Sequence, residues 1–276
     1  MDYSKHTMLT CASAMQEIVK ALHQSCGLNY FNYVKNFNDN SRICLTTNAE
    51  WADRFCNNKL YLVAPFERDK DKYESNEYIY WPAMKDHVIY QEALQCKVSH
   101  AVTIVKKGKV FDEFYHFGSD VFDYTTYDNV VSNRDLLNFF ILYFKDKAEK
   151  LIKNSQLLTF PEYTNQSNNK NVLQNKSMPK ELKQTDDIFN ILKLKKYYLG
   201  ADFGDVYLTQ KEINILRWVI IGKSASEIAI LLNMNFRTIQ QHIENIKIKT
   251  NCTKTAELCY KIGCSDIGEI LKKIIF

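Results

Sequence analysis

Five polar side chains near the C-terminus are of types that read the edges of DNA bases: Asn235, Arg237, Thr238, Gln240 and Gln241. Arginine can donate two hydrogen bonds to guanine, glutamine and asparagine pair with adenine, and threonine is short and adaptable. Three lysines follow that could neutralise backbone phosphates: Lys247, Lys249 and Lys254. This stretch therefore predicts contact with double-stranded DNA.

The elements that would position these side chains are marked by two capping boxes. In Thr209-Gln-Lys-Glu212 and Ser224-Ala-Ser-Glu227, a hydroxyl and a carboxylate three residues apart can satisfy each other's backbone amides. The first helix should end at Gly222, and the second should carry Ile228, Ala229, Leu231 and Leu232. The turn 233–235 then leads into a third helix that runs to about Thr250.

A short helix, a three-residue turn and a longer helix are typical of a helix-turn-helix, whose second helix lies in the major groove. A fourth helix is expected near residues 254–262. The pattern alone also fits a small helical bundle whose polar residues are only a solvated face.

The segment from Leu208 to Lys249 resembles the LuxR-type helix-turn-helix domain. The family pattern is matched at Leu208, Thr209, Glu212, Leu216, Trp218, Gly222, Ser224, Glu227, Ile228, Ala229, Leu232, Thr238, Ile239, His242, Asn245 and Lys249. The resemblance implies DNA binding as a homodimer that reads two half-sites, with Asn245 among the contacts. The departures are Lys211 for Arg, Gln240 where Lys is common, and Thr250 for Leu. Gln240 removes a cation and so implies a different base preference or fewer phosphate contacts.

The chain continues past this resemblance with an amphipathic tail, residues 265–276. Its apolar side chains are Ile267, Ile270, Leu271 and Ile274. They either pack on the same domain or form a dimer contact.

The first part of the chain mixes helical and strand-like patterns. Helices are expected at about 9–25 and 133–153, strands at Tyr30–Val34 and Arg42–Leu45, and a hairpin from Ala101 to Tyr115. The predicted architecture is an α+β sensor domain, an antiparallel sheet with flanking helices, followed by a small all-α helix-turn-helix domain. The expected domains are residues 1–160, a polar linker with a short hairpin at 161–204, and the DNA-binding domain at 205–276.

The N-terminal region also shows a loose resemblance to the autoinducer-binding domain that precedes many LuxR-type domains. That family's pocket motif is W-x-x-x-Y, eight residues, D-P, and a later Trp. The matching positions, with Tyr61 as added aromatic surface, are Trp51, Phe55, Ala64 and Trp81. Phe55 and Ala64 replace the two polar residues that hold the acyl amide, and an unsatisfied buried amide costs about 1–3 kcal/mol per group. This site therefore fits an ordinary acyl-homoserine lactone poorly. Aromatic core packing and a PAS- or GAF-like sensor are the alternatives.

Other functional classes lack their sequence signals. No nucleotide-binding, nucleophile-elbow or zinc-protease motif is present, and the hairpin breaks the alternation that a receiver domain needs. We therefore expect no enzyme activity, no cofactor and no metal. The longest apolar run, Phe139 to Phe144, is far shorter than the roughly 20 residues of a membrane span. The eight cysteines have neither disulfide-framework nor zinc spacing, which favours free thiols in the cytoplasm.

Charge adds weak support for a polyanionic partner. Residues 205–276 carry ten Lys/Arg and seven Asp/Glu, a net charge of +3, out of +4 for the whole chain. The sequence thus predicts a transcription regulator, cytoplasmic and dimeric, controlled by an unidentified small-molecule effector. The alternative is a dimerisation partner or antagonist of other regulators that does not itself bind DNA.

Overall fold

The computed structural model describes residues 6–64, 73–81, 86–120, 130, 134–160, 194–265, 267, 268, 270 and 271. Most of the expected polar linker, and Ile274 of the tail, lie outside these residues. The chain divides into two compact units, one of Met1–Arg134 with Lys147–Leu182 and one of Asp135–Asp146 with Lys183–Phe276. The expected sensor helix near 133–153 thus contributes twelve of its residues, 135–146, to the second unit. Within the described ranges, no helix has the length and apolarity needed to cross a bilayer.

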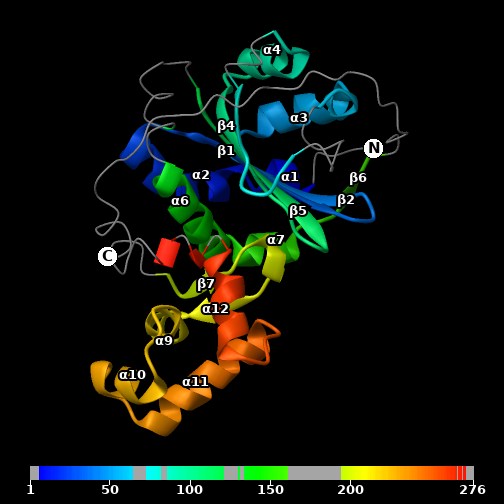
Figure 1. The fold of residues 1–276 in the computed structure, drawn as a ribbon. Helices are drawn as coiled ribbons and strands as arrows, with labels where there is room; N and C mark the ends of the chain where they lie inside the picture. The colour runs from blue at the N-terminus through cyan, green and yellow to red at the C-terminus, as the bar shows by residue number, and fades with distance from the viewer. Residues whose placement is uncertain are drawn as a thin grey trace. The chain divides into compact units, whose positions relative to one another are not determined.

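The first unit is built on a six-stranded antiparallel sheet with the order β3-β4-β5-β1-β2-β6 (Figure 1). The strands are β1 (Tyr30–Phe37), β2 (Ser41–Thr46), β3 (Tyr78–Tyr80), β4 (Ser99–Lys106), β5 (Phe111–Ser119) and β6 (Leu158–Thr159). The hairpin expected from Ala101 to Tyr115 is the β4–β5 pair, in which Val105 lies opposite Phe114. Both strands expected earlier in the chain are confirmed as β1 and β2.

The helices of this unit are shorter than sequence periodicity predicts. They are α1 (Thr7–Thr10), α2 (Ala12–Cys26), α3 (Ala49–Asn57), α4 (Val88–Gln95), α7 (Glu149–Asn154) and the 3-10 turn η1 (Leu60–Leu62). The single helix expected at 9–25 is interrupted at Cys11, and the one expected at 133–153 is α6 (Arg134–Lys147) followed by α7. Ala148 lies between α6 and α7 and is fully buried. The apolar periodicity in the sequence therefore does not stop at Ala148, although the helix does.

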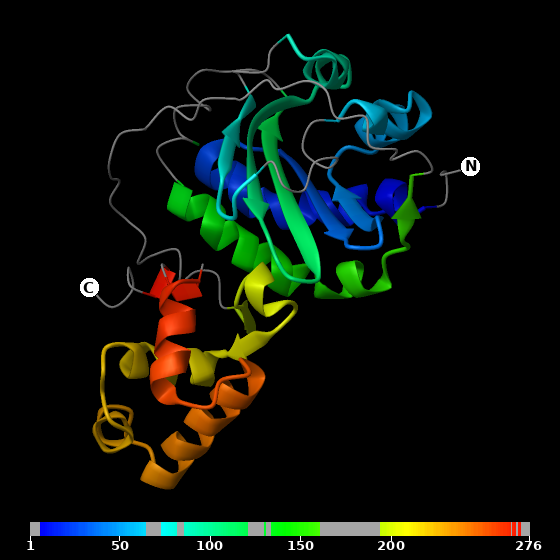
Figure 2. The same ribbon diagram turned by 45° about the vertical axis from the view of Figure 1, so that its right-hand side comes forward.

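Both faces of the sheet are covered, and the two faces pack different side chains. On β1, Tyr30 and Val34 belong to a cluster that includes Trp51 of α3 and Ile89 of α4. The alternate residues Phe31 and Tyr33 pack on aromatic rings of β5. Helix α2 runs along the sheet (Figure 2). Because side chains alternate across a strand, every residue of β5 is buried on one face or the other.

The described part of the second unit contains most of α6, a hairpin and a series of further helices. Besides α6, its elements are β7 (Lys196–Tyr198), the 3-10 turn η3 (Ala201–Phe203), β8 (Tyr207–Thr209), α9 (Gln210–Ile220), α10 (Ala225–Leu231), α11 (Phe236–Lys249) and α12 (Thr255–Gly263). The β7–β8 pairing confirms the hairpin expected before the helical domain. Phe139 and Leu142 of α6 share a core with Leu208, Leu216 and Ile262.

The start of the C-terminal tail also packs into this core. Ile267, Ile270 and Leu271 are buried in the same cluster as Leu216. Their apolar face is therefore covered within the unit, as the first of the two alternatives for the tail requires.

Candidate nucleic-acid interface

The two expected capping boxes fix the starts of α9 and α10. At α9, the Thr209 hydroxyl accepts from the Glu212 amide at 3.4 Å, and the Glu212 carboxylate accepts from the Thr209 amide at 2.8 Å. At α10, Ser224 and Glu227 exchange the same two bonds, at 3.3 and 2.8 Å. Each box satisfies backbone amides that have no partner inside the helix at its start. Each helix therefore begins at the capping box predicted from the sequence.

The turn between α10 and α11 positions the longer helix. Asn233 adopts a left-handed φ of 49°, which asparagine tolerates better than most residues. The Asn235 side chain then caps α11 by accepting from the Arg237 amide at 2.8 Å. Beneath the turn, Ile228 of α10 and Ile239 of α11 are fully buried with Ile215 of α9. The helix-turn-helix predicted from the sequence is therefore present.

The apolar residues that the second helix was expected to carry differ in burial. Leu231 lies in α10 as expected but is half exposed. Ile228 and Ala229 fill the inward face, while Ile230 and Leu231 lie on the other side of a helix only seven residues long.

The side chains expected to read bases lie on the exposed surface of α11 and at its cap. Asn235, Arg237, Thr238, Gln240 and Gln241 are all exposed. Among the described residues, the Arg237 guanidinium makes no hydrogen bond or ion pair, and Gln240 makes none through its amide. Gln241 donates to the Asn245 side chain at 3.0 Å, which aligns two amide groups one helical turn apart. The exposed surface of α11 thus carries the Arg237 guanidinium together with the side-chain amides of Gln241 and Asn245.

The three lysines expected to contact phosphate have different surroundings. Lys254 is exposed at the start of α12, with no side-chain partner among the described residues. Lys247 forms an ion pair with Glu244 at 2.7 Å and donates to the Thr253 carbonyl at 3.4 Å. Lys249 donates to the Glu212 carboxylate at 2.8 Å. Only Lys254 offers its ammonium group without first giving up an intramolecular bond.

The Lys249–Glu212 contact ties the end of α11 to the start of α9. Burial raises the pKa of the Glu212 carboxyl, but hydrogen bonds from Lys249 and Thr209 outweigh that effect and hold its pKa below the ordinary value. Glu212 is buried and is therefore a structural carboxylate, as the sequence led us to expect.

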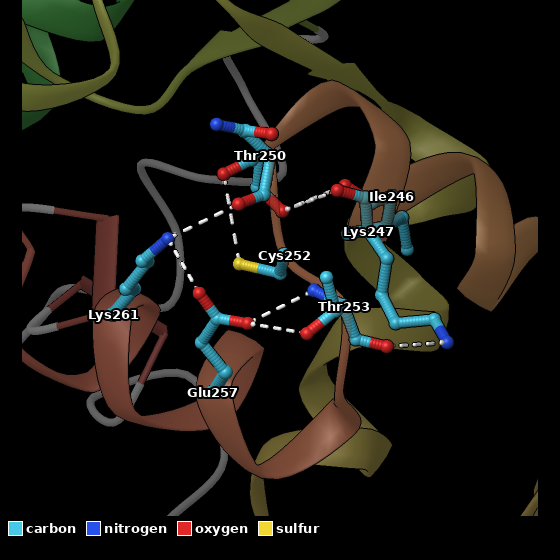
Figure 3. A network of polar contacts seen from close by, with 8 residues as sticks. Ile246, Lys247, Thr250, Cys252, Thr253, Glu257 and Lys261 are labelled. Atoms are coloured by element: carbon cyan, nitrogen blue, oxygen red, sulfur yellow. Dashed lines mark hydrogen bonds and ion pairs between the residues drawn. The ribbon is translucent and has the colours of Figure 1, made fainter.

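A polar network joins the end of α11 to α12 (Figure 3). The Thr250 hydroxyl donates to the Ile246 carbonyl at 2.8 Å, so a residue that departs from the family's Leu is buried without leaving its hydroxyl unsatisfied. Glu257 accepts from the Thr253 amide at 2.9 Å and pairs with Lys261 at 2.8 Å. The bonds from Lys261 and Thr253 lower the pKa of Glu257 to about 2. This corner holds the segment that carries Lys254.

Comparison with known proteins identifies this part of the chain. Residues 206–261 match the profile of the family described as "Bacterial regulatory proteins, luxR family". This segment is a LuxR-type helix-turn-helix domain. Over 66 residues the chain is 35% identical to the HTH-type quorum sensing-dependent transcriptional regulator VjbR of Brucella abortus and of Brucella melitensis. The match covers 23% of this chain and 26% of each relative, about a quarter of the relatives' length.

Two solved structures overlap with nearly the whole chain at low similarity. One is described as "SdiA in complex with octanoyl-rac-glycerol", with a TM-score of 0.37, 14% identity, and coverage of 92% of this chain and 91% of that one. The other is Escherichia coli SdiA, with a TM-score of 0.32, 12% identity, and coverage of 98% and 97%. Neither value identifies the family of the first unit.

The residues expected to form a ligand pocket meet in the first unit. Trp51, Phe55, Ala64 and Trp81 line one cavity of about 50 Å³. Tyr61 lies outside the lining, with its ring stacked at 4.0 Å on that of Phe160, which does line the cavity.

Sequence reasoning missed the polar wall of this cavity, which includes Asn32, Arg42 and His116. The only signal was the alternation of polar and apolar residues in Arg42-Ile-Cys-Leu-Thr46. Such alternation normally places the polar face of a strand in solvent.

Proposed function

We propose that this chain is a sequence-specific DNA-binding transcription regulator controlled by its N-terminal sensor unit. The observation that carries the proposal is the exposed surface of α11 in a LuxR-type domain, where Arg237 has no intramolecular partner among the described residues. A guanidinium held at the start of a recognition helix can donate two hydrogen bonds to guanine. The proposed partner is double-stranded DNA, bound in the cytoplasm.

Each α11 helix is proposed to read one half-site, so the working form is a homodimer. Asn235, Thr238, Gln240 and Gln241 would contact base edges, with Asn245 supporting Gln241. Lys254 would bind phosphate directly. Lys247 and Lys249 are each paired with a carboxylate and would contribute less to phosphate binding. The sensor domain would occupy about residues 1–160, and the DNA-binding domain residues 205–276.

A second candidate function is that of a dimerisation partner that does not itself occupy promoters. It is favoured by Glu244, whose side chain is 57% exposed on α11, because a carboxylate there repels phosphate. Gln240, where the family often has Lys, acts in the same direction. Genome-wide crosslinking of the tagged full chain separates the two functions, since discrete promoter peaks support the regulator and their absence supports the partner.

The decisive test of the regulator is base discrimination by Arg237. A preferred site is first selected from random duplexes with the purified full chain, and fluorescence anisotropy then measures binding to every single-base-pair variant. Arg237→Ala should lose about 1–3 kcal/mol of discrimination at one base pair. Lys254→Ala, the matched control, should weaken binding evenly across all variants. Retention of the full base preference by Arg237→Ala would exclude α11 as the reading helix.

A further inference from the structure

Helix α11 turns one face away from the core of its unit, and a carboxylate lies on that face. Ile239 and Ile246 are fully buried on the inner side of the helix. At 3.6 residues per turn, the opposite side carries Arg237, Gln241 and Glu244, which are four and then three residues apart. All three are exposed. Glu244 therefore lies in the same row as the side chains assigned to base reading.

The chemistry of a carboxylate restricts what Glu244 can contact on DNA. It repels phosphates, so it adds nothing to the affinity for the backbone. An ionised carboxylate can only accept hydrogen bonds. In the major groove, guanine presents two acceptors, thymine an acceptor and a methyl group, and adenine an amino group beside the acceptor N7. Cytosine presents its N4 amino group with no acceptor of its own next to it, so cytosine is the base that a carboxylate fits.

Lys247 holds the Glu244 carboxylate in place from one side. Its ammonium group lies 2.7 Å from Glu244 Oε1. The same group donates to the Thr253 carbonyl at 3.4 Å (Figure 3). The Lys247 side chain is only 14% exposed, whereas that of Glu244 is 57% exposed. Among the described residues, Lys247 is the only side chain bonded to Glu244, so the second oxygen, Oε2, can accept from a partner outside the chain.

The position of Glu244 along α11 places it within reach of the same half-site as Arg237. Seven residues at 1.5 Å each separate the two by about 10.5 Å along the helix axis, which equals about three base-pair steps. A helix that lies in the major groove can therefore present the guanidinium to one base pair and the carboxylate to another of the same half-site.

We propose that Glu244 is a specificity-determining residue that accepts a hydrogen bond from the N4 amino group of one cytosine in each half-site. The inference rests on the proposed function, since it concerns the same reading helix. At any other base the carboxylate loses its water without gaining a donor, while the nearby phosphates still repel it. Glu244 thus selects the cytosine mainly by weakening the binding of duplexes that lack it.

The first test changes the base and uses the duplex that the full chain selects. Each cytosine of this duplex is replaced in turn by N4-methylcytosine, and fluorescence anisotropy measures binding at one salt concentration. The modified base still pairs with guanine, but it presents a methyl group to the major groove where cytosine presents an amino hydrogen. At one position of each half-site the replacement should weaken binding by about 10-fold or more. Glu244→Ala should lose most of this sensitivity.

The second test changes the side chain. Glu244→Gln keeps the shape of the side chain but gains a donor, which thymine O4 can accept. It should reduce the discrimination between cytosine and thymine at that position by about 5- to 100-fold, mainly through tighter binding of the thymine duplex. The matched control is Glu17→Gln in α2, because Glu17 also pairs with a lysine three residues on, Lys20, at 2.6 Å. This control should keep the discrimination of the unaltered chain.

Three results would overturn the inference and leave the proposed function intact: a selected duplex in which every cytosine tolerates the methyl group, a methyl sensitivity that persists in Glu244→Ala, and full discrimination by Glu244→Gln. If Glu244→Gln does not fold, the methyl scan with the unaltered chain and Glu244→Ala decides. A full chain that selects no duplex at all would reject the proposed function, and the inference with it.

Discussion

Lys247, Lys249 and Lys254 have different roles because their neighbouring side chains differ. All three have the charge that phosphate requires, and sequence alone cannot separate them. In the structure Lys249 bonds to Glu212, which is 6% exposed, while Lys254 has no side-chain partner among the described residues. Lys249 therefore belongs to the framework of the domain, and Lys254 to its surface.

Substitution of each lysine by Met should separate these roles. Lys249→Met should destabilise the second unit by about 1 kcal/mol, because it breaks a charge-assisted bond that water only partly screens. It should change the salt dependence of DNA binding little. Lys254→Met should leave stability unchanged and reduce the slope of log K against log salt concentration by about 1. Urea titrations and anisotropy over a salt series measure the two effects, and a reversed pattern would reject the assignment.

At the scale of elements, capping residues predicted where helices begin, and the spacing of apolar residues predicted which helix faces are buried. Thr209, Ser224 and Asn235 each lie at a helix start, because their bonds to nearby amides need no tertiary partner. The breaks at Cys11 and Ala148 could not be predicted, since both residues are buried and continue the apolar pattern. Leu231 is half exposed because a seven-residue helix has few inward positions, and Ile228 and Ala229 take them.

The second capping box offers a local test of this view. Ser224→Ala should cost about 1 kcal/mol and raise deuterium uptake in peptides covering Ala225–Leu231, because the Glu227 amide loses its acceptor. Ser226→Ala is the matched control, since Ser226 is equally exposed but lies inside the helix. Alanine is the better helix former there, so uptake should stay the same or fall. Equal uptake in both variants would show that the cap does not set the start of α10.

The polar wall of the cavity illustrates what an element's sequence does not reveal. In β2, Arg42, Cys44 and Thr46 alternate with Ile43 and Leu45, as in a strand with one wet face. Here both faces are covered, because helices pack on each side of the sheet, and the polar side chains line a cavity instead. The aromatic wall was predicted from spacing in the chain. The polar wall requires β5, which is distant in sequence, to lie beside the consecutive strands β1 and β2.

At the scale of the whole molecule, the two units respond differently to acid. In the second unit, Glu212, Glu227 and Glu257 have lowered pKa values, the last two at about 2. Their contributions are complete above the ordinary value of 4.5 and are lost as the pH falls toward 2. In the first unit, burial lowers the pKa of His116 from 6.5 to about 3 and also lowers that of His6. Below pH 6.5 these histidines become protonated in the unfolded chain but stay neutral in the folded unit. The free energy of unfolding of the first unit therefore declines as the pH falls below 6.5.

The first unit should therefore weaken before the second on mild acidification. Between pH 7.5 and 5.5, His116 alone should cost the first unit about 1 kcal/mol, because its unfolded form becomes protonated while the buried ring stays neutral. The chain is titrated with urea at each of the two pH values, and each sample is then labelled by a short pulse of hydrogen exchange at one common pH. Mass spectrometry of the peptides gives a separate unfolding midpoint for each unit. The midpoint of the first unit should fall at pH 5.5 while that of the second stays nearly constant. His116→Gln, which does not titrate, should lose most of the shift, and a shift of equal size in both units would contradict this assignment.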